Sequence, residues 1–301
     1  MKKEITMPLN LSEEQKRLLD MHGFLNILTV LQEELLRMKT MVGGVAFEGC
    51  LGVVKKMIET LAENSPTIIT THQMLEFQSY IEEEYTLHTA DTVLSEEVSK
   101  KLESSRNNIR SIFRVIHVRV RELLLRSGND DEWITMSSSD VRDTCLELLE
   151  AMVKNSKKRF GVSYKKEHQK ENDYLVDIDI SGYNGSEMTL PLVILQSFQD
   201  LIANSRKYTP PGGTIHARLK EEPNRLIMQV KDNGFGIPED QFEHVVEFGF
   251  RARNVLHKDT KGGGFGLTKA YYVTKKLNGR FWIDSKMDSG TTITAEIPKN
   301  P

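Results

Sequence analysis

Residues 225–238 read RLIMQVKDNGFGIP and contain the strongest local signal in the sequence. The apolar run from Leu226 to Val230 predicts a β-strand, and Asp232 ends it. Gly234 and Gly236 then let the backbone turn sharply and approach a flat ligand, while Asp232 offers a buried acceptor that suits an exocyclic amine. Taken alone, an ordinary turn after a strand explains this pattern equally well.

A second glycine-rich stretch lies about thirty residues further on. Residues 262–267 read GGGFGL and precede a helix predicted from Gly266 to Lys276. Small residues and free amide donors at the start of a helix are suited to bind phosphate groups.

The third stretch lies upstream, where residues 199–209 read QDLIANSRKYT on a predicted helix. Asp200, Asn204 and Lys207 are spaced by four and three residues, so we expect them on one helical face. A carboxylate, an amide and an ammonium on one face could bind a hydrated Mg²⁺ ion and the phosphates that it bridges. A polar stripe of this kind is otherwise ordinary solvated surface.

In this order and spacing, the three stretches resemble the ATP-binding domain of sensor histidine kinases, in the superfamily that includes DNA gyrase, heat-shock chaperones and mismatch-repair ATPases. The resemblance covers about residues 133–298 and implies a Bergerat-type α/β sandwich that uses ATP and Mg²⁺. The implied cofactor-binding residues, with Asn204 also as the metal ligand, are Asn204, Lys207, Tyr208, Asp232, Gly234, Gly236, Ile237, Arg251, Lys261, Gly262, Gly264, Gly266, Leu267 and Thr291.

The resemblance also implies individual roles. Asp232 would read adenine with support from Thr291, and Arg251 and Lys261 would belong to a mobile lid over the phosphates. Residues 245–251, VVEFGFR, are similar to the F box of the family, with a valine in place of its characteristic phenylalanine. Many histidine kinases have asparagine or histidine at the position of Asp200, whereas gyrase-like ATPases have an acid that activates water. Asp200 is therefore expected to act as a base or as a second-sphere metal ligand.

The first 130 residues read as helical. Apolar residues at spacings of three and four predict long helices from Leu11 to Val42 and from Ser104 to Arg126, separated by an inserted helical segment at about 43–103. A polar stretch from Glu82 to Ser99 is expected to help divide this segment into shorter helices and loops. Two such helices bury their apolar seams best in a four-helix bundle, which predicts a homodimer. The expected fold class is thus α+β, with a helical dimerisation and phosphotransfer domain at 1–130 and an ATP-binding domain at 131–301.

Further elements are predicted in the second domain. The expected strands are residues 133–136, 162–165, 174–180, 214–219, 225–231, 280–285 and 291–297. The expected helices are residues 138–158, 190–208 and 266–276.

A histidine on the outer flank of the first helix is the expected phosphate acceptor. His22 adjoins the apolar seam but shares a polar stripe with Asn26, and the segment resembles an H box in which Asn26 orients water. Gly23 stands where many of these kinases have an acid, so either Asp200 or another carboxylate serves as the base, or autophosphorylation is slow, or His22 is not the acceptor. His117 is the rival acceptor.

These residues predict a soluble histidine kinase with His22, Asp200 and Asn26 as catalytic residues and a response-regulator receiver domain as partner. Two alternatives stay open: an ATPase or ATP-gated interaction protein without histidine phosphotransfer, and a serine kinase of the anti-sigma type.

Composition sets the remaining expectations. The 40 Lys and Arg residues nearly balance the 43 Asp and Glu residues, so neither nucleic acid nor membrane is expected as a partner. Cys50 and Cys145 match no metal or disulfide spacing. Because no leader segment and no apolar run of about 18 residues is evident, we expect a cytoplasmic protein.

Overall fold

The computed structural model describes residues 2–62, 70–90, 94–126, 132–156, 159–257 and 264–299. The chain divides into a sheet unit, Met1–Leu19 with Asn129–Pro301, and a helical unit, Asp20–Gly128. Each unit has its own hydrophobic core. The predicted fold class, helices first and an α/β sandwich second, is confirmed.

The sheet unit is built on a seven-stranded sheet with the strand order β1-β8-β9-β7-β6-β4-β3. Its strands are β1 (Lys2–Glu4), β3 (Val162–Ser163), β4 (Tyr174–Ser181), β6 (Thr214–Glu221), β7 (Arg225–Asp232), β8 (Arg280–Lys286) and β9 (Gly290–Pro298). The β3–β4 and β4–β6 pairs are parallel, and the other neighbours are antiparallel. A separate antiparallel pair consists of β2 (Trp133–Ser137) and β5 (Glu187–Pro191).

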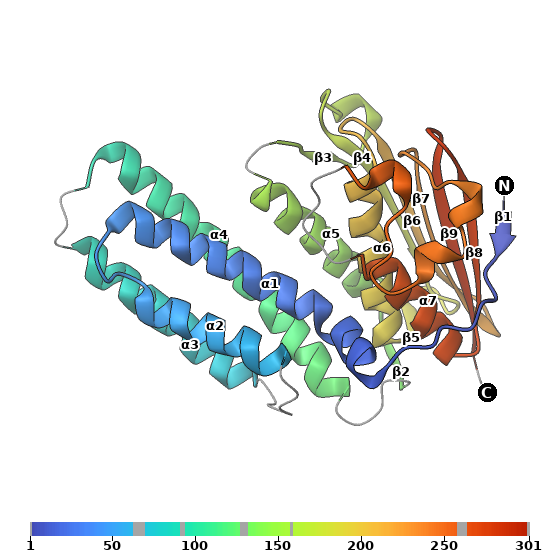
Figure 1. Cartoon of the computed structure of the whole chain (residues 1–301), viewed down its shortest axis with the longest axis horizontal. Helices are drawn as coiled ribbons and strands as arrows, with labels where there is room; N and C mark the ends of the chain where they lie inside the picture. The colour runs from blue at the N-terminus through green and yellow to red at the C-terminus, as the bar shows by residue number, and fades with distance from the viewer. Residues whose placement is uncertain are drawn as a thin grey trace. The chain divides into compact units, whose positions relative to one another are not determined.

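Three helices cover one face of this sheet: α5 (Ser138–Asn155), α6 (Leu192–Tyr208) and α7 (Gly266–Lys276) (Figure 1). Short 3₁₀ turns lie at Lys166–His168, Glu239–Gln241, His244–Val246 and Arg253–Val255. Aromatic side chains on the helices and the sheet, such as Phe198, Tyr271 and Phe281, are fully buried between the layers. This packing fixes α6 and α7 against the strands that carry the glycine-rich turn.

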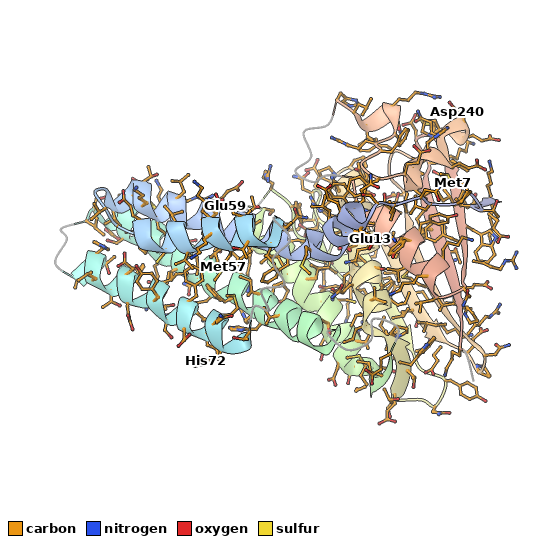
Figure 2. All side chains as sticks on the ribbon, turned by 60° about the horizontal axis from the view of Figure 1, so that its bottom comes forward. Met7, Glu13, Met57, Glu59, His72 and Asp240 are labelled. Carbon is orange, nitrogen blue, oxygen red and sulfur yellow. The ribbon has the colours of Figure 1, made fainter. Side chains whose placement is uncertain are left out.

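Strand β1 was not predicted, and it changes the assignment of the N-terminus. The prediction placed residues 1–130 in the helical domain, but the first 19 residues belong to the sheet unit. β1 pairs with β8, Ile5 is fully buried, and Tyr271 donates a hydrogen bond of 2.6 Å to the carbonyl of Met7 (labelled in Figure 2). Glu4 forms two hydrogen bonds with Arg280. A three-residue strand with two lysines has no detectable periodicity, which explains why the pattern missed it.

The helical unit contains α1 (Glu13–Val42, from Asp20 onwards), α2 (Glu48–Ala62), α3 (Thr71–Ala90) and α4 (Glu96–Arg126), which run up and down alongside one another (Figure 1). The segment predicted as an insertion at 43–103 is part of one shared core, because Phe47 of the α1–α2 loop and Met74 of α3 are as buried as Leu28 and Ile116 of the long helices. It is not a separate module.

Two boundaries in this unit differ from the prediction. Residues 82–99 were expected to contain loops, yet α3 continues to Ala90 and α4 begins at Glu96 rather than Ser104. Ion pairs satisfy the polar side chains within the helices. Glu82 of α3 bonds Arg106 and Arg110 of α4, which holds the pKa of Glu82 below its usual value against the effect of its burial.

The seams of the long helices are covered largely within one chain. Leu28 and Leu35 of α1 and Ile109 and Ile116 of α4 are at most 2% exposed, although Leu25 stays half-buried. Much of the apolar surface that was expected to require a second copy is therefore buried by α2 and α3 of the same chain.

We expect Phe77→Ala to destabilise the helical unit by about 3–5 kcal/mol, because Phe77 is 5% exposed and its ring packs edge-on against Phe113 of α4 at 5.9 Å. Urea unfolding followed by circular dichroism measures this change. Leu87→Ala on the same helix is the control, since Leu87 is 68% exposed and the change should stay within about 0.5 kcal/mol. Equal effects of the two substitutions would show that α3 does not belong to the core.

Candidate nucleotide-binding site

A cavity of about 100 Å³ opens between α6, the end of β7, the start of α7 and the segment after the third 3₁₀ turn. It is lined by Leu201, Asn204, Ser205, Tyr208, Asp232, Gly236, Ile237, Val245, Phe250, Arg251, Ala252, Val255, Gly264, Leu267, Thr291 and Ile293. The three stretches singled out in the sequence therefore meet at one place in the fold.

The carboxylate of Asp232 lies at the base of this cavity and is 8% exposed. Its Oδ1 accepts hydrogen bonds from the backbone nitrogens of Gly234 at 2.9 Å and Thr291 at 3.2 Å, and its Oδ2 accepts one from the Ser205 hydroxyl at 3.1 Å. Burial raises the pKa of Asp232, and these three hydrogen bonds act against that rise. The result is a fixed, buried acceptor that faces the cavity.

The glycine-rich turn after β7 is possible only because its glycines have no side chains. A Cβ on Gly234 would lie 2.3 Å from the carbonyl oxygen of Tyr208, and Gly236, with a φ of +68°, would place one 2.1 Å from the carbonyl oxygen of Lys286. The turn thus packs directly against the end of α6 and the β8–β9 turn. Ser285 accepts a hydrogen bond from the nitrogen of Ile237 at 2.9 Å, and Asn254 donates one to the carbonyl of Gly236 at 2.9 Å.

The face of α6 that lines the cavity consists of Leu201, Asn204, Ser205 and Tyr208. Of Asp200, Asn204 and Lys207, which were predicted to share one helical face, only Asn204 lines the cavity. The Asp200 carboxylate instead lies 3.4 Å from the ammonium of Lys269 on α7. This contact could not be predicted from the sequence, because Asp200 and Lys269 lie far apart in it and meet only when α6 and α7 pack together.

The start of α7 lies beside Asn204. A Cβ on Gly266 would lie 2.6 Å from Nδ2 of Asn204, and Gly264 adopts a φ of +77° just before the helix. Phe265, at the N-cap position, supplies no side-chain hydrogen bond to the first turn. Backbone N–H groups at this end are therefore suited to bind an anion.

The segment that resembles the F box holds this helix start in place. Thr268 of α7 donates a hydrogen bond of 2.9 Å to the carbonyl of Glu247, and the rings of Phe248 and Phe265 lie 4.5 Å apart. Val246, the departure from the family pattern, is fully buried. A smaller apolar side chain at this position is thus accommodated in the core.

Cations gather at the same end of α6. Burial lowers the pKa of Lys207 to about 8, with further contributions from the charges of Arg251 and Arg206. The Lys207 ammonium lies 5.3 Å from the centre of the Tyr208 ring. A bound anion would offset the mutual repulsion of these cations.

Some predicted residues cannot be placed. Lys261 and Gly262 lie outside the described residues. His22 belongs to α1, but its side chain is not described, whereas the side chain of Asn26 on the same helix is exposed. The structure adds Ser205, Ser285, Asn254 and Lys269, which sequence reasoning missed because each acts through contacts between distant segments.

Residues 189–301 match the family described as histidine kinase-, DNA gyrase B-, and HSP90-like ATPase. This segment holds α6, the glycine-rich turn and α7, the elements that line the cavity. Residues 189–301 are therefore the part of this chain that is similar to the ATPase domains of this family, and this segment is called the ATPase domain below. The predicted resemblance to the histidine-kinase type of this domain is confirmed.

Parts of known sensor histidine kinases are similar in sequence to about a third of this chain. The Synechocystis sensor histidine kinase RppB is 34% identical over 99 residues, which are 33% of this chain and 22% of that protein. The Bacillus subtilis sensor histidine kinase WalK is 36% identical over 107 residues, 35% of this chain and 18% of that protein. The chain therefore matches only about a fifth of the length of these relatives.

Solved structures of histidine kinases also match, at lower identity. A mycobacterial sensor histidine kinase, MprB, is 21% identical with a TM-score of 0.40 and covers 56% of this chain and 99% of its own. The catalytic domain of histidine kinase ThkA is 20% identical with a TM-score of 0.41, over 56% of this chain and 99% of its own.

The donor set of the ATPase domain fits Mg²⁺ bound mainly through a nucleotide. In the described ranges, no group of three His, Cys, Asp or Glu side chains could bind a metal ion. Asn204 offers an amide beside the cavity, and Mg²⁺ is commonly bound by one or two protein oxygens together with phosphates and water.

Of the helices that the structure describes, none combines the length and apolarity needed to cross a bilayer.

We expect Asp232→Asn to weaken ATP binding by about 10- to 100-fold, because the amide oxygen can still accept from the Gly234 and Thr291 N–H groups, whereas the amide nitrogen puts a donor in place of the second buried acceptor, beside Ser205. Isothermal titration calorimetry measures the change. Asp177→Asn is the control, since its side chain is 70% exposed on the sheet and should not alter binding. Undiminished affinity of the Asp232 variant would remove this carboxylate from the nucleotide site.

We expect ATP affinity to fall as the pH rises above about 8, by at most about tenfold per pH unit. Below pH 8 the free protein already carries the Lys207 ammonium, whereas above it a proton must be taken up before the lysine can pair with phosphate. Calorimetry in buffers of different ionisation enthalpy measures this proton uptake. Lys207→Met should bind ATP more weakly and show a flatter pH profile, and an unchanged profile would contradict the assignment.

Proposed function

We propose that this protein is a histidine kinase that binds Mg-ATP, phosphorylates itself on a histidine and passes the phosphoryl group to an aspartate of a response-regulator receiver domain. The observation that carries the proposal is the Asp232 carboxylate, fixed by three hydrogen bonds inside the cavity of the ATPase domain. The likeness of this domain to sensor histidine kinases supports the choice among the activities of the superfamily.

The contacts suggest how the parts of ATP would lie. The free lone pairs of the Asp232 carboxylate suit the exocyclic amine of adenine, and Ile237, Leu267 and Ile293 supply apolar surface for the ring. The phosphates would lie toward the start of α7 and the cations Lys207 and Arg251. Bound Mg²⁺ would neutralise charge that develops on the phosphates, with Asn204 as its protein ligand.

His22 is the proposed acceptor, and Asn26 is proposed to orient the water that removes the phosphoryl group. The rival acceptor His117 is less suited to this role. Its Nε2 lies 3.1 Å from Oε1 of Gln78, the ring packs near Phe113, and burial lowers the pKa of His117. An imidazole engaged in this way would have to break its contact with Gln78 before its Nε2 could attack a phosphate.

The homodimer and the cytoplasmic location stay predictions. The receiver domain as a partner, with neither nucleic acid nor membrane, follows from the proposed reaction and from the balanced charge of the chain.

Incubation with γ-³²P-labelled ATP and Mg²⁺ should give a protein label that is labile in acid and stable in alkali, and His22→Ala should remove it. His72→Ala is the matched control, because His72 also lies on a helix and is 81% exposed (Figure 2), so its label should persist. Full labelling of the His22 variant would exclude this histidine as the acceptor.

The alternatives give different outcomes in the same assay. Free phosphate without labelled protein would indicate an ATPase, and an acid-stable label would indicate a serine kinase. Label that is lost only in His117→Ala would transfer the acceptor role to α4.

A further inference from the structure

Lys269 of α7 is a buried cation that neither the glycine pattern nor the cavity explains. The residue is 3% exposed, and it lies three positions after Gly266, at which the helix begins. Lysine is seldom buried to this extent unless its ammonium has partners, because the loss of hydration is large. The partners of Lys269 therefore indicate what its position is for.

Two of these partners lie on α6, one helical turn apart. The Lys269 ammonium is 3.4 Å from Oδ2 of Asp200 and donates a hydrogen bond of 3.3 Å to Oε1 of Gln196. Gln196 is itself 3% exposed, and the Asp200 side chain is 21% exposed. A buried lysine on α7 thus meets an amide and a carboxylate on one face of α6.

The next position along this face of α6 is Asn204. Asn204 packs against Gly266, where a Cβ would come within 2.6 Å of its amide nitrogen. The Lys269–Asp200 pair and the Asn204–Gly266 contact are therefore successive contacts along the same helix–helix interface. A shift of α7 that broke the ion pair would also change the distance between Asn204 and the start of α7.

We propose that Lys269 is a positioning residue for the phosphate-binding end of α7, with Asp200 as its counterion. The pair sets how far α7 lies along α6, and through this it sets the spacing between Asn204 and the N–H groups that follow Gly264. The proposal rests on the proposed ATP binding and replaces the base expected at Asp200 with an indirect role. The position of the Asp200 carboxylate supports the indirect role, since the carboxylate contacts Lys269 and is not among the residues that line the cavity.

Three variants test the proposal: Asp200→Asn, Lys269→Met and the double variant. In Asp200→Asn the buried ammonium loses its counterion, so ATP affinity should fall about tenfold while adenosine affinity changes less than about twofold. Adenosine lacks the phosphates that would lie against the N–H groups at the start of α7, so its binding should depend mainly on Asp232, Ile237 and Ile293 and only through Leu267 on the position of α7. A general loss of structure would weaken both ligands alike, and that result would overturn the positioning role.

The double variant separates positioning from base catalysis. Without the lysine, no unpaired buried ammonium is left to displace α7, so ATP affinity and the rate of phosphoryl labelling should recover part of the loss seen in Asp200→Asn, and the loss that remains is the positioning that only the pair supplies. A base cannot be restored by removing a lysine. A double variant that labels as slowly as Asp200→Asn would therefore overturn the proposal in favour of a catalytic carboxylate.

Asp179→Asn is the control for the change of carboxylate to amide, because Asp179 forms an ion pair with Arg218 on β6 at 2.9 Å with both side chains about half exposed. Its binding and labelling should not change. If the unmodified protein binds no ATP, the proposed function fails. If it binds ATP and the ratio of ATP to adenosine affinity is the same in all variants, only the role of Lys269 fails.

Discussion

The hydrogen bonds to the Asp232 carboxylate are the interaction on which the site depends. They join the last residue of β7 to the turn that follows it, to the first residues of β9 and to the side chain of Ser205 on α6. A buried carboxylate tolerates burial only when donors surround it, so these segments have to come together for the domain to fold. The carboxylate that is proposed to bind adenine is thus also a condition for the sandwich around it to fold.

The glycine turn after β7 likewise contributes both to the site and to the packing of the domain. Gly234 and Gly236 are in contact with backbone atoms of α6 and of the β8–β9 turn, at distances that no side chain would permit. The backbone of this turn lines the cavity and also closes the core around it. Changes at these two positions would affect folding and binding together, which separates them from Asn204 and Lys207, whose side chains project from a helix that is otherwise well packed.

The sequence predicted most of the ATPase domain because its elements are long and periodic and because the glycines that mark its turns have a local reason to be there. Of the eight α-helices and strands that the structure describes from Tyr174 to Pro298, it predicted all except β5, and it placed Asn204, Asp232 and Thr291 in one site. It failed where contacts join distant segments. Nothing near Asp200 indicates Lys269, and nothing in Lys2–Glu4 indicates a strand until Arg280 and the edge of β8 are brought beside it. The polar residues of 82–99 were read as loops because their charge partners lie on a neighbouring helix.

Because β1 pairs with β8, the helical unit is inserted between two segments of the sheet unit. The polypeptide leaves the sheet unit after its first residues and returns to the same unit at β2, so both ends of the helical unit are tied to one body. A unit attached by one end could rotate about a single linker, whereas one attached by both ends loses much of that freedom. A change in β1 or in β2 therefore alters one of the two points at which the helical unit is anchored to the sheet unit.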